Sequence, residues 1–159
     1  MIHGNSRGVS SRYFTLEEAN ALVPRLALHM ARAVQLHLLV RRATTELHRR
    51  GCRVTQAMLL GRDEDDVPPG AEQALLRARG VYEAMNEEAA KMEALGAQIK
   101  GLDHGIADFP SLLDGETEVL LCWRLGEGRI THFHLPEAGF AGRKPVAGRT
   151  FASRRAAPV

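Results

Sequence analysis

The sequence predicts an α+β fold in which a long antiparallel helical hairpin packs with a small antiparallel sheet of three or four strands. Apolar residues recur at helical spacing over residues 19–47 and again over 71–99. From Val119 onward they follow the two-residue repeat that is typical of strands. The chain has 159 residues, of which 45% are hydrophobic, and this indicates one domain with a core that needs no disulfides.

The chain divides into one structured body and two flexible ends. Residues 1–11 and the basic segment 146–159 carry no regular apolar spacing, and we expect a disordered leader and a flexible tail there. Residues 12–145 are expected to form the single domain, with the helical hairpin over 15–99 and the sheet over 97–136.

The first helix is expected to begin near Leu16. Thr15 and Glu18 fit a capping box, in which the hydroxyl and the carboxylate satisfy free amide groups at a helix start. Pro24 lies inside the helical pattern and predicts a kink or a restart. Gly51 is expected to end this helix.

The second helix is expected over residues 71–99, after a polar excursion of the chain. This excursion covers residues 62–70, which contain an acidic run and two consecutive prolines, and residues 56–60 predict a further turn of helix before it. The two long helices are expected to pack antiparallel along their apolar seams.

Three polar residues, His37, Thr44 and Glu88, interrupt the apolar seams. Buried acid beside imidazole is able in principle to hold a metal or a proton. Simple antiparallel pairing does not bring His37 opposite Glu88, so we interpret all three as residues at the edge of the seam.

Three strands are predicted in the sheet part of the chain. The apolar pattern favours strands over residues 98–102, 118–124 and 129–135. The sequence Leu-Gly-Glu-Gly joins the last two strands, and its glycines supply the positive φ angles of a tight hairpin. Asp108 and Arg143 are expected in loops.

Side-chain alternation in this hairpin predicts which residues share a face of the sheet. If Arg124 pairs with Arg129, then His132 and His134 lie on one face. Cys122 then points to the other face, where we interpret it as a small buried apolar residue.

His132 and His134 are the strongest candidates for chemistry. They are two residues apart on a predicted strand, so both imidazoles project to one side, a spacing that recurs in zinc, copper and iron sites. Asp103, His104 and Asp108 are the nearest candidates in the sequence for a further ligand. An ordinary polar sheet edge, hydrogen-bonded to the backbone, is the alternative interpretation.

A second candidate is the stretch over residues 139–145, Gly-Phe-Ala-Gly-Arg-Lys-Pro. Its glycines let backbone amides converge on an anion, and Arg143 offers a planar guanidinium to a carboxylate or a phosphate. A plain turn that packs Phe140 on the core is the alternative.

Composition and motifs argue against several classes of protein. The longest apolar runs are far shorter than a membrane span, and two cysteines without a secretion signal indicate a cytoplasmic protein. The net charge is +2, and the arginines at the end of the first helix and in the tail leave only a weak case for nucleic-acid binding. No Cys-x-x-Cys, Gly-x-Ser-x-Gly or Walker-type phosphate loop occurs, so no familiar enzyme class is indicated and the question of catalysis stays open.

Several sets of residues spread over 12–145 combine into a recognisable pattern. They are residues 12–20 with Pro24, Asp103 with Gly105, residues 108–110, residues 119–123 with Gly126 and Glu127, and His134 with residues 139–143. In this pattern the chain resembles an uncharacterised bacterial family, the domain of unknown function 2203. The resemblance implies no reaction.

The resemblance does bear on the choice of site residues. In the family pattern the position of His132 is more often another aromatic residue, whereas the position of His134 is histidine. The resemblance therefore favours a shared site made of His134, Asp108, Asp103 and Arg143, with Asn20 and Glu18 as further candidates at the start of the first helix.

Taken together, the residues predict a small metal-binding protein with a His/Asp site at the sheet. The expected ligands are His134, His132, Asp108 and Asp103, and zinc or iron suits imidazole and carboxylate ligands best. One alternative is a helical hairpin that acts as a non-catalytic interaction module, and another is a weak nucleic-acid binder. A lone hairpin leaves apolar surface that a few strands cannot cover, so we expect a homodimer.

Overall fold

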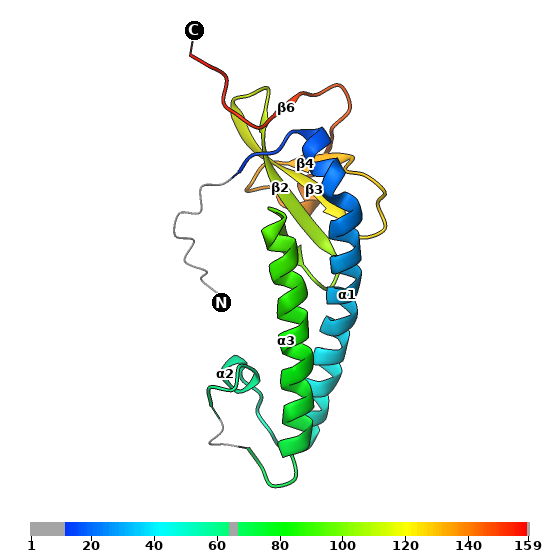
Figure 1. Cartoon of the computed structure of the whole chain (residues 1–159), viewed down its shortest axis with the longest axis vertical. Coiled ribbons are helices and arrows are strands. Elements are labelled where there is room, and N and C mark those ends of the chain that lie inside the picture. The colour runs from blue at the N-terminus through cyan, green and yellow to red at the C-terminus, as the bar shows by residue number, and fades with distance from the viewer. Residues whose placement is uncertain (1–11, 64–66, 159) are drawn as a thin grey trace.

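The computed structural model describes residues 12–63 and 67–158, and it has the predicted α+β architecture. The expected disordered leader, residues 1–11, lies outside the described residues. Two long helices form an arm that extends away from an antiparallel sheet (Figure 1). The elements are α1 Leu16–Arg49, α2 Gln56–Leu59, α3 Glu72–Ala94, β1 Gln98–Gly101, β2 Ile106–Leu113, β3 Thr117–Arg124, β4 His132–His134, the 3-10 helix η1 Phe140–Gly142, β5 Lys144–Pro145 and β6 Phe151–Ala152.

Helix α1 begins where the sequence predicts. Thr15 Oγ1 accepts a hydrogen bond from the Glu18 amide at 3.1 Å, while the Glu18 carboxylate pairs with the side chain of Arg12. The helix continues through Pro24, so the expected restart does not occur. Val23 and Leu26 lie on either side of this proline and are buried in the core, and their packing offsets the hydrogen bond that proline cannot donate.

The arm is an antiparallel pair of helices with an apolar cluster at each end. Near the sheet, Met30 of α1 and Met92 of α3 belong to the main core. At the far end, a second cluster encloses Leu47 and Cys52 together with Met58 of α2, which lies beside the arm (Figure 1). Cys52 is therefore a buried apolar residue of the distal cluster.

The sheet has six strands rather than the three or four expected. The strand order is β1-β2-β3-β4-β5, with β6 paired to β2, and all neighbours are antiparallel. Strand β6 lies within the segment 146–159, so this part of the chain is not the free tail expected from the sequence. Phe151 of β6 packs edge-on against Phe133, with ring centroids 5.2 Å apart, and this contact fixes the segment around β6 on the sheet.

Strand β2 is the long strand that the sequence does not predict, because Pro110 lies in its middle. The carbonyl of Pro110 accepts a hydrogen bond from the Phe14 amide at 2.8 Å. The N–H and C=O groups of one strand residue point to the same side, so the missing N–H of Pro110 faces Phe14 rather than β3. Proline is therefore compatible with full pairing of β2 and β3, and Asp108 lies in a central strand instead of a loop.

The register of β3 and β4 differs from the prediction. Cys122 faces His132 across this pair, whereas the sequence suggests pairing of Arg124 with Arg129. The connection between the strands is longer than a tight hairpin and covers residues 125–131. A shift of pairing by one residue turns every side chain to the opposite face. Cys122 therefore shares a face with both histidines of β4, contrary to the prediction.

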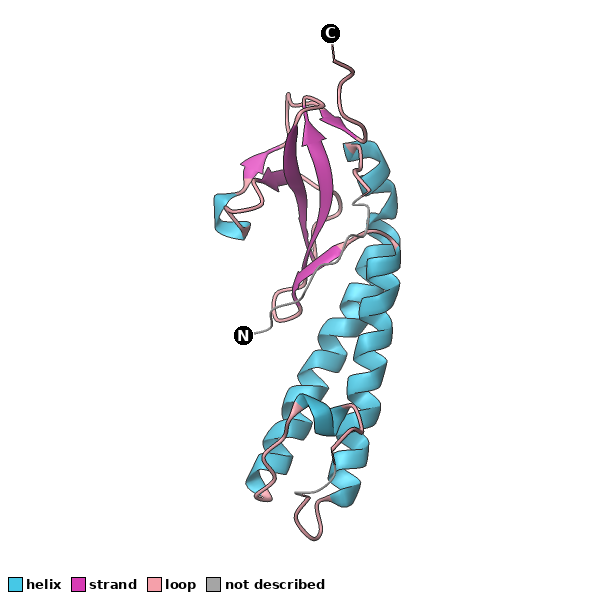
Figure 2. Cartoon of the chain, turned by 90° about the vertical axis from the view of Figure 1, so that its left-hand side faces the viewer, coloured by secondary structure: helices cyan, strands magenta, loops and turns pink. Residues whose placement is uncertain are grey.

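The two faces of the sheet have different surroundings. One face packs against α1 and the arm, and its core residues are Ala107, Phe109, Leu121, Trp123 and Phe133. The other face points away from the arm, and η1 lies on that side of the sheet (Figure 2). This second face carries Asp108, Cys122 and His134, all of them buried.

Candidate functional site

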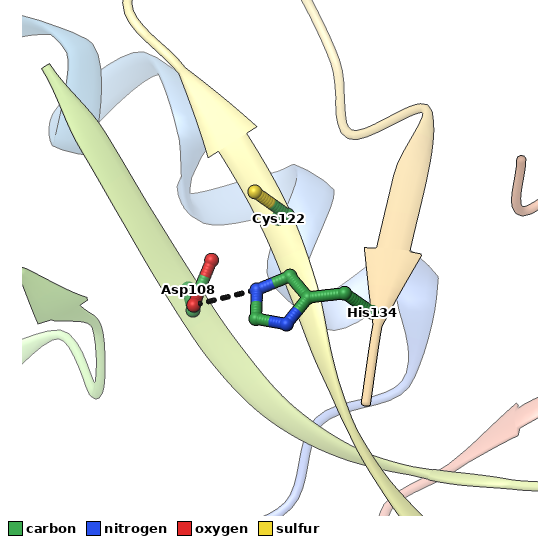
Figure 3. Close-up of side chains that lie close together, drawn as sticks. All are labelled: Asp108, Cys122 and His134. Atoms are coloured by element: carbon green, nitrogen blue, oxygen red, sulfur yellow. Dashed lines mark hydrogen bonds and ion pairs between the residues drawn. The ribbon is translucent and has the colours of Figure 1, made fainter. Parts of the chain in front are cut away.

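Three buried side chains converge on the face of the sheet that points away from the arm. They are Asp108 of β2, Cys122 of β3 and His134 of β4, so three adjacent strands contribute one residue each (Figure 3). Their oxygen, sulfur and nitrogen atoms all lie within 4.8 Å of one another. Asp108 and Cys122 are 0% exposed and His134 is 3% exposed. The three residues form a compact polar cluster from which water is almost excluded.

His134 and Asp108 form a buried pair whose proton content follows from the geometry. The Nε2 atom of His134 lies 3.0 Å from Oδ2 of Asp108, and its Nδ1 atom lies 2.8 Å from the carbonyl oxygen of Leu135. Because a carbonyl oxygen only accepts, Nδ1 must carry a proton. Nε2 then faces the carboxyl oxygen either with a second proton, as imidazolium, or with its lone pair toward a protonated acid. One proton, or a metal cation in its place, must therefore lie between the two side chains.

Cys122 is a thiol rather than a thiolate in this environment. Burial raises the pKa of Cys122 to about 12, and the neighbouring charge of Asp108 acts in the same direction. Among the described residues, Oδ1 of Asp108 meets no donor with full hydrogen-bond geometry, and a side-chain hydrogen bond between Cys122 and Asp108 adds to the rise of the thiol pKa. A buried oxygen without a well-placed donor costs free energy, and it marks the position as one suited to a cation or a proton donor.

Arg143 lies beside this cluster, but another side chain already compensates its charge. Its Nη2 atom donates to the two carboxylate oxygens of Glu127 at 2.9 and 3.1 Å and to the carbonyl of Cys122 at 3.4 Å. The guanidinium also stacks on the Phe140 ring, 4.6 Å from its centroid. These contacts bring Arg143 next to Cys122. The sequence predicts that Arg143 binds an anion, and in the structure the carboxylate of Glu127 occupies that position.

His132 lies on the same face as Cys122 but outside the convergent group. It is partly exposed, and its Nδ1 atom lies 2.8 Å from the hydroxyl of Thr131. Of the two histidines predicted as a pair of ligands, the structure thus brings only His134 together with Asp108.

Asp103 and His104 lie in the turn between β1 and β2, and both are exposed. Asp103 bonds to α1, since its Oδ1 atom lies 2.9 Å from Nε2 of His37 and 3.4 Å from Nη1 of Arg41. The hydrogen bond from His37 holds the pKa of Asp103 below its usual value. The role of this residue in the structure is to tie the sheet to the arm rather than to join the buried cluster.

The two candidates from the start of α1 also bond away from the cluster. Asn20 Oδ1 accepts a hydrogen bond from the Ile130 amide at 2.7 Å, which fixes the β3–β4 connection on the helix. Glu18 pairs with Arg12 at the surface.

Cys122 is the member of the cluster that sequence reasoning misses. The predicted pairing of the hairpin reverses its face, and a lone cysteine in a strand carries no spacing signal of its own. A second polar pair is also missed, in which His29 Nδ1 of α1 lies 2.6 Å from Glu88 Oε2 of α3. The apolar pattern of the sequence points only to His37 as a partner for Glu88.

Comparison with known proteins gives a match to a family model. The model of the family described as uncharacterized conserved protein (DUF2203) matches residues 12–146. No curated protein and no solved structure matches the chain. Among the described residues, no helix combines the length and the apolar character needed to cross a membrane.

Proposed function

We propose a metal-binding function for this chain, which belongs to the DUF2203 family of uncharacterized conserved proteins. The proposed site consists of Asp108, Cys122 and His134, and the proposed metal is a divalent transition ion, zinc in the first place and iron in the second. One observation carries the proposal: three buried ligand-type side chains from three adjacent strands lie within 4.8 Å of one another.

The chemistry of the three donors supports this choice of metal. Zinc is bound in proteins by cysteine sulfur, histidine nitrogen and carboxylate oxygen, usually with four ligands in a tetrahedral arrangement. Thiolate and imidazole disfavour calcium and magnesium, which prefer oxygen ligands. The Nδ1 atom of His134 bonds to a backbone carbonyl, and metal-binding histidines commonly hold their second nitrogen in this way.

Charge balance in the buried cluster supports a divalent cation in particular. A thiolate at Cys122 and a carboxylate at Asp108 bring two negative charges, and neutral His134 brings none. A divalent ion would neutralise both charges, replace the proton between His134 and Asp108, and give Oδ1 of Asp108 a partner. It would also keep Cys122 deprotonated despite the burial that raises its pKa to about 12 in the metal-free protein.

The test is elemental analysis of full-length protein purified without an affinity tag, followed by titration of the chelator-treated protein with zinc. We expect about one equivalent of zinc or iron per chain, and a higher melting temperature when zinc is restored. Cys122→Ser should lose the metal. Cys52→Ser changes a cysteine that is buried in the distal cluster, and it should keep the metal. Less than about a tenth of an equivalent, with no stabilisation by added zinc, would contradict the proposal.

A second candidate function is self-association through the helical arm, in keeping with the expected homodimer. Leu28, Leu38 and Leu39 of α1 are 50%, 48% and 44% exposed. The arm extends well beyond the sheet (Figure 1), and exposed apolar side chains on such an element favour contact with a partner surface. Analytical ultracentrifugation tests this proposal, because Leu38→Glu should convert a dimer to a monomer without changing the helical circular dichroism signal.

A further inference from the structure

We propose, on the basis of the metal-binding function above, that His132 supplies a fourth ligand and that the site is closed, with a structural role for the metal. The ligands would then be Asp108, Cys122, His132 and His134. This assignment names the residue that fills the last coordination position, and it distinguishes a metal that stabilises the sheet from one that meets a substrate.

The strand register brings His132 next to the other ligands. Asp108 faces Cys122 across β2 and β3, and Cys122 faces His132 across β3 and β4, so the three residues form one row across the sheet. Facing residues of an antiparallel pair lie on the same side, with Cβ atoms about 4.5–5.5 Å apart. The imidazole of His132 is therefore one strand spacing away from the thiol of Cys122.

The side chain of His132 is held by a weak and exchangeable contact. Its Nδ1 atom lies 2.8 Å from the Thr131 hydroxyl, which is an exposed group, whereas the ring nitrogens of His134 bond to the buried Asp108 and to the part-buried carbonyl of Leu135. As a ligand, His132 would rotate about its Cα–Cβ bond and exchange this one contact for a position over the row. The loss is small, because water competes for an exposed hydrogen bond.

Burial of the other three ligands favours a closed site. Catalytic zinc sites keep one coordination position open to water or substrate, whereas structural sites fill all four positions with protein ligands. Asp108 and Cys122 are completely buried and His134 nearly so, while His132 is partly exposed at the end of the row. His132 would therefore fill the remaining coordination position from the partly exposed end of the row.

A closed site of this kind would stabilise the C-terminal part of the sheet. Strand β4 has three residues, and β5 and β6 have two each, so these strands contribute few backbone hydrogen bonds. The ligands come from β2, β3 and β4, and the unfolded chain holds no such arrangement. Binding of the metal would therefore favour the folded sheet and join its short strand β4 to the two long ones.

The test replaces His132 with alanine in the full-length protein. Zinc affinity is measured by competition with a chromophoric chelator, and the ligand number is read from the visible spectrum of the cobalt(II)-loaded protein, in which four-coordinate sites absorb most strongly. Loss of a residue that merely hydrogen-bonds to a ligand costs about 10- to 100-fold in affinity, so loss of a true ligand should exceed about 100-fold. We expect His132→Ala to pass this limit and to weaken the cobalt bands. His104→Ala removes an exposed histidine and should change neither.

A second variant keeps His132 and removes the group that competes for it. Thr131→Val should bind zinc at least as tightly as the wild-type protein, and added imidazole should restore the strong cobalt bands to His132→Ala. A loss smaller than about 100-fold in His132→Ala, or an unchanged four-coordinate spectrum, would overturn the inference. Wild-type protein that binds no zinc would instead contradict the metal-binding function itself.

Discussion

In the buried face of the sheet, Nε2 of His134 lies 3.0 Å from Oδ2 of Asp108 while Nδ1 of the same ring donates to the carbonyl of Leu135. Both ring nitrogens are thus engaged, and the contact with Asp108 depends on one proton or one cation. Loss of this proton or cation would leave the buried pair without its link. The carboxyl group of Asp108 therefore has two separate roles, one in folding and one in the proposed binding of a metal.

Asp108→Ala should destabilise the metal-free protein by about 3–5 kcal/mol, because it leaves His134 without its partner in a buried site. Asp108→Asn should recover much of this loss, since the amide donates a hydrogen bond to the unprotonated Nε2 of His134. The asparagine variant should nevertheless bind zinc more weakly than the wild-type protein, because a neutral amide replaces the carboxylate. Urea unfolding in the presence of a chelator, together with zinc titration, measures both effects. Equal zinc affinity of Asp108→Asn and the wild-type protein would exclude Asp108 as a ligand.

Cys122 predicts a loss of stability at alkaline pH in the metal-free protein. Burial raises the pKa of this thiol from 9.0 to about 12, so the unfolded chain releases the proton at lower pH than the folded one. The contribution of the protonated Cys122 thiol to the stability of the fold is complete below about pH 9, and it disappears as pH rises through about 12. Urea unfolding between these limits should show stability falling with pH, and Cys122→Ala should flatten this dependence. An equally steep fall in Cys122→Ala would contradict the prediction.

Glu88 predicts a pH dependence of the opposite sign in the arm. Burial alone would raise the pKa of Glu88, but hydrogen bonds from His29 and Lys91 outweigh it and hold the pKa below the usual 4.5. As the pH falls, the carboxylate of Glu88 is therefore protonated at a higher pH in the unfolded chain than in the folded one. The contribution of Glu88 to the stability of the fold is lost as pH falls below about 4.5. Glu88→Gln should reduce the loss of helical signal on acidification, with the exposed neighbour Glu87→Gln as the control. Identical acid unfolding curves for both variants would rule out this role.

The sequence predicts the helical arm well because its apolar spacing is regular over many turns. The second helix is expected over residues 71–99 and is found as Glu72–Ala94, and the strand expected over 118–124 is found as Thr117–Arg124. Strand β2 escapes prediction because Pro110 is a poor strand residue in general. Its compatibility here depends on the contact with Phe14, which is distant in the sequence and has no local signal.

The sequence predicts only part of the candidate site, because the predicted register of β3 and β4 is wrong by one residue. The sequence identifies Asp108 and His134, but it assigns Cys122 to the opposite face because the glycines after Arg124 suggest a tight turn. The observed connection is longer, since Asn20 of α1 bonds to the Ile130 amide and holds that segment outside the strand pair. The hydrogen bond between Asn20 of α1 and the Ile130 amide thus accompanies the register of β3 and β4 that brings Cys122 to His134.

Two glycines of the arm should respond in opposite ways to the same substitution. Gly80 lies in α3 with open space around it, so alanine should stabilise the protein by about 0.5–1 kcal/mol through its higher helix propensity. Gly96 follows α3 with φ +98°, and a Cβ atom there would overlap the buried ring of Phe14. Phe14 packs edge-on against Phe109 in the main core, with centroids 5.0 Å apart, so its ring has little room to move. Gly96→Ala should therefore cost at least about 1–3 kcal/mol in urea unfolding, and a neutral effect would show that the β1 end of the arm repacks freely.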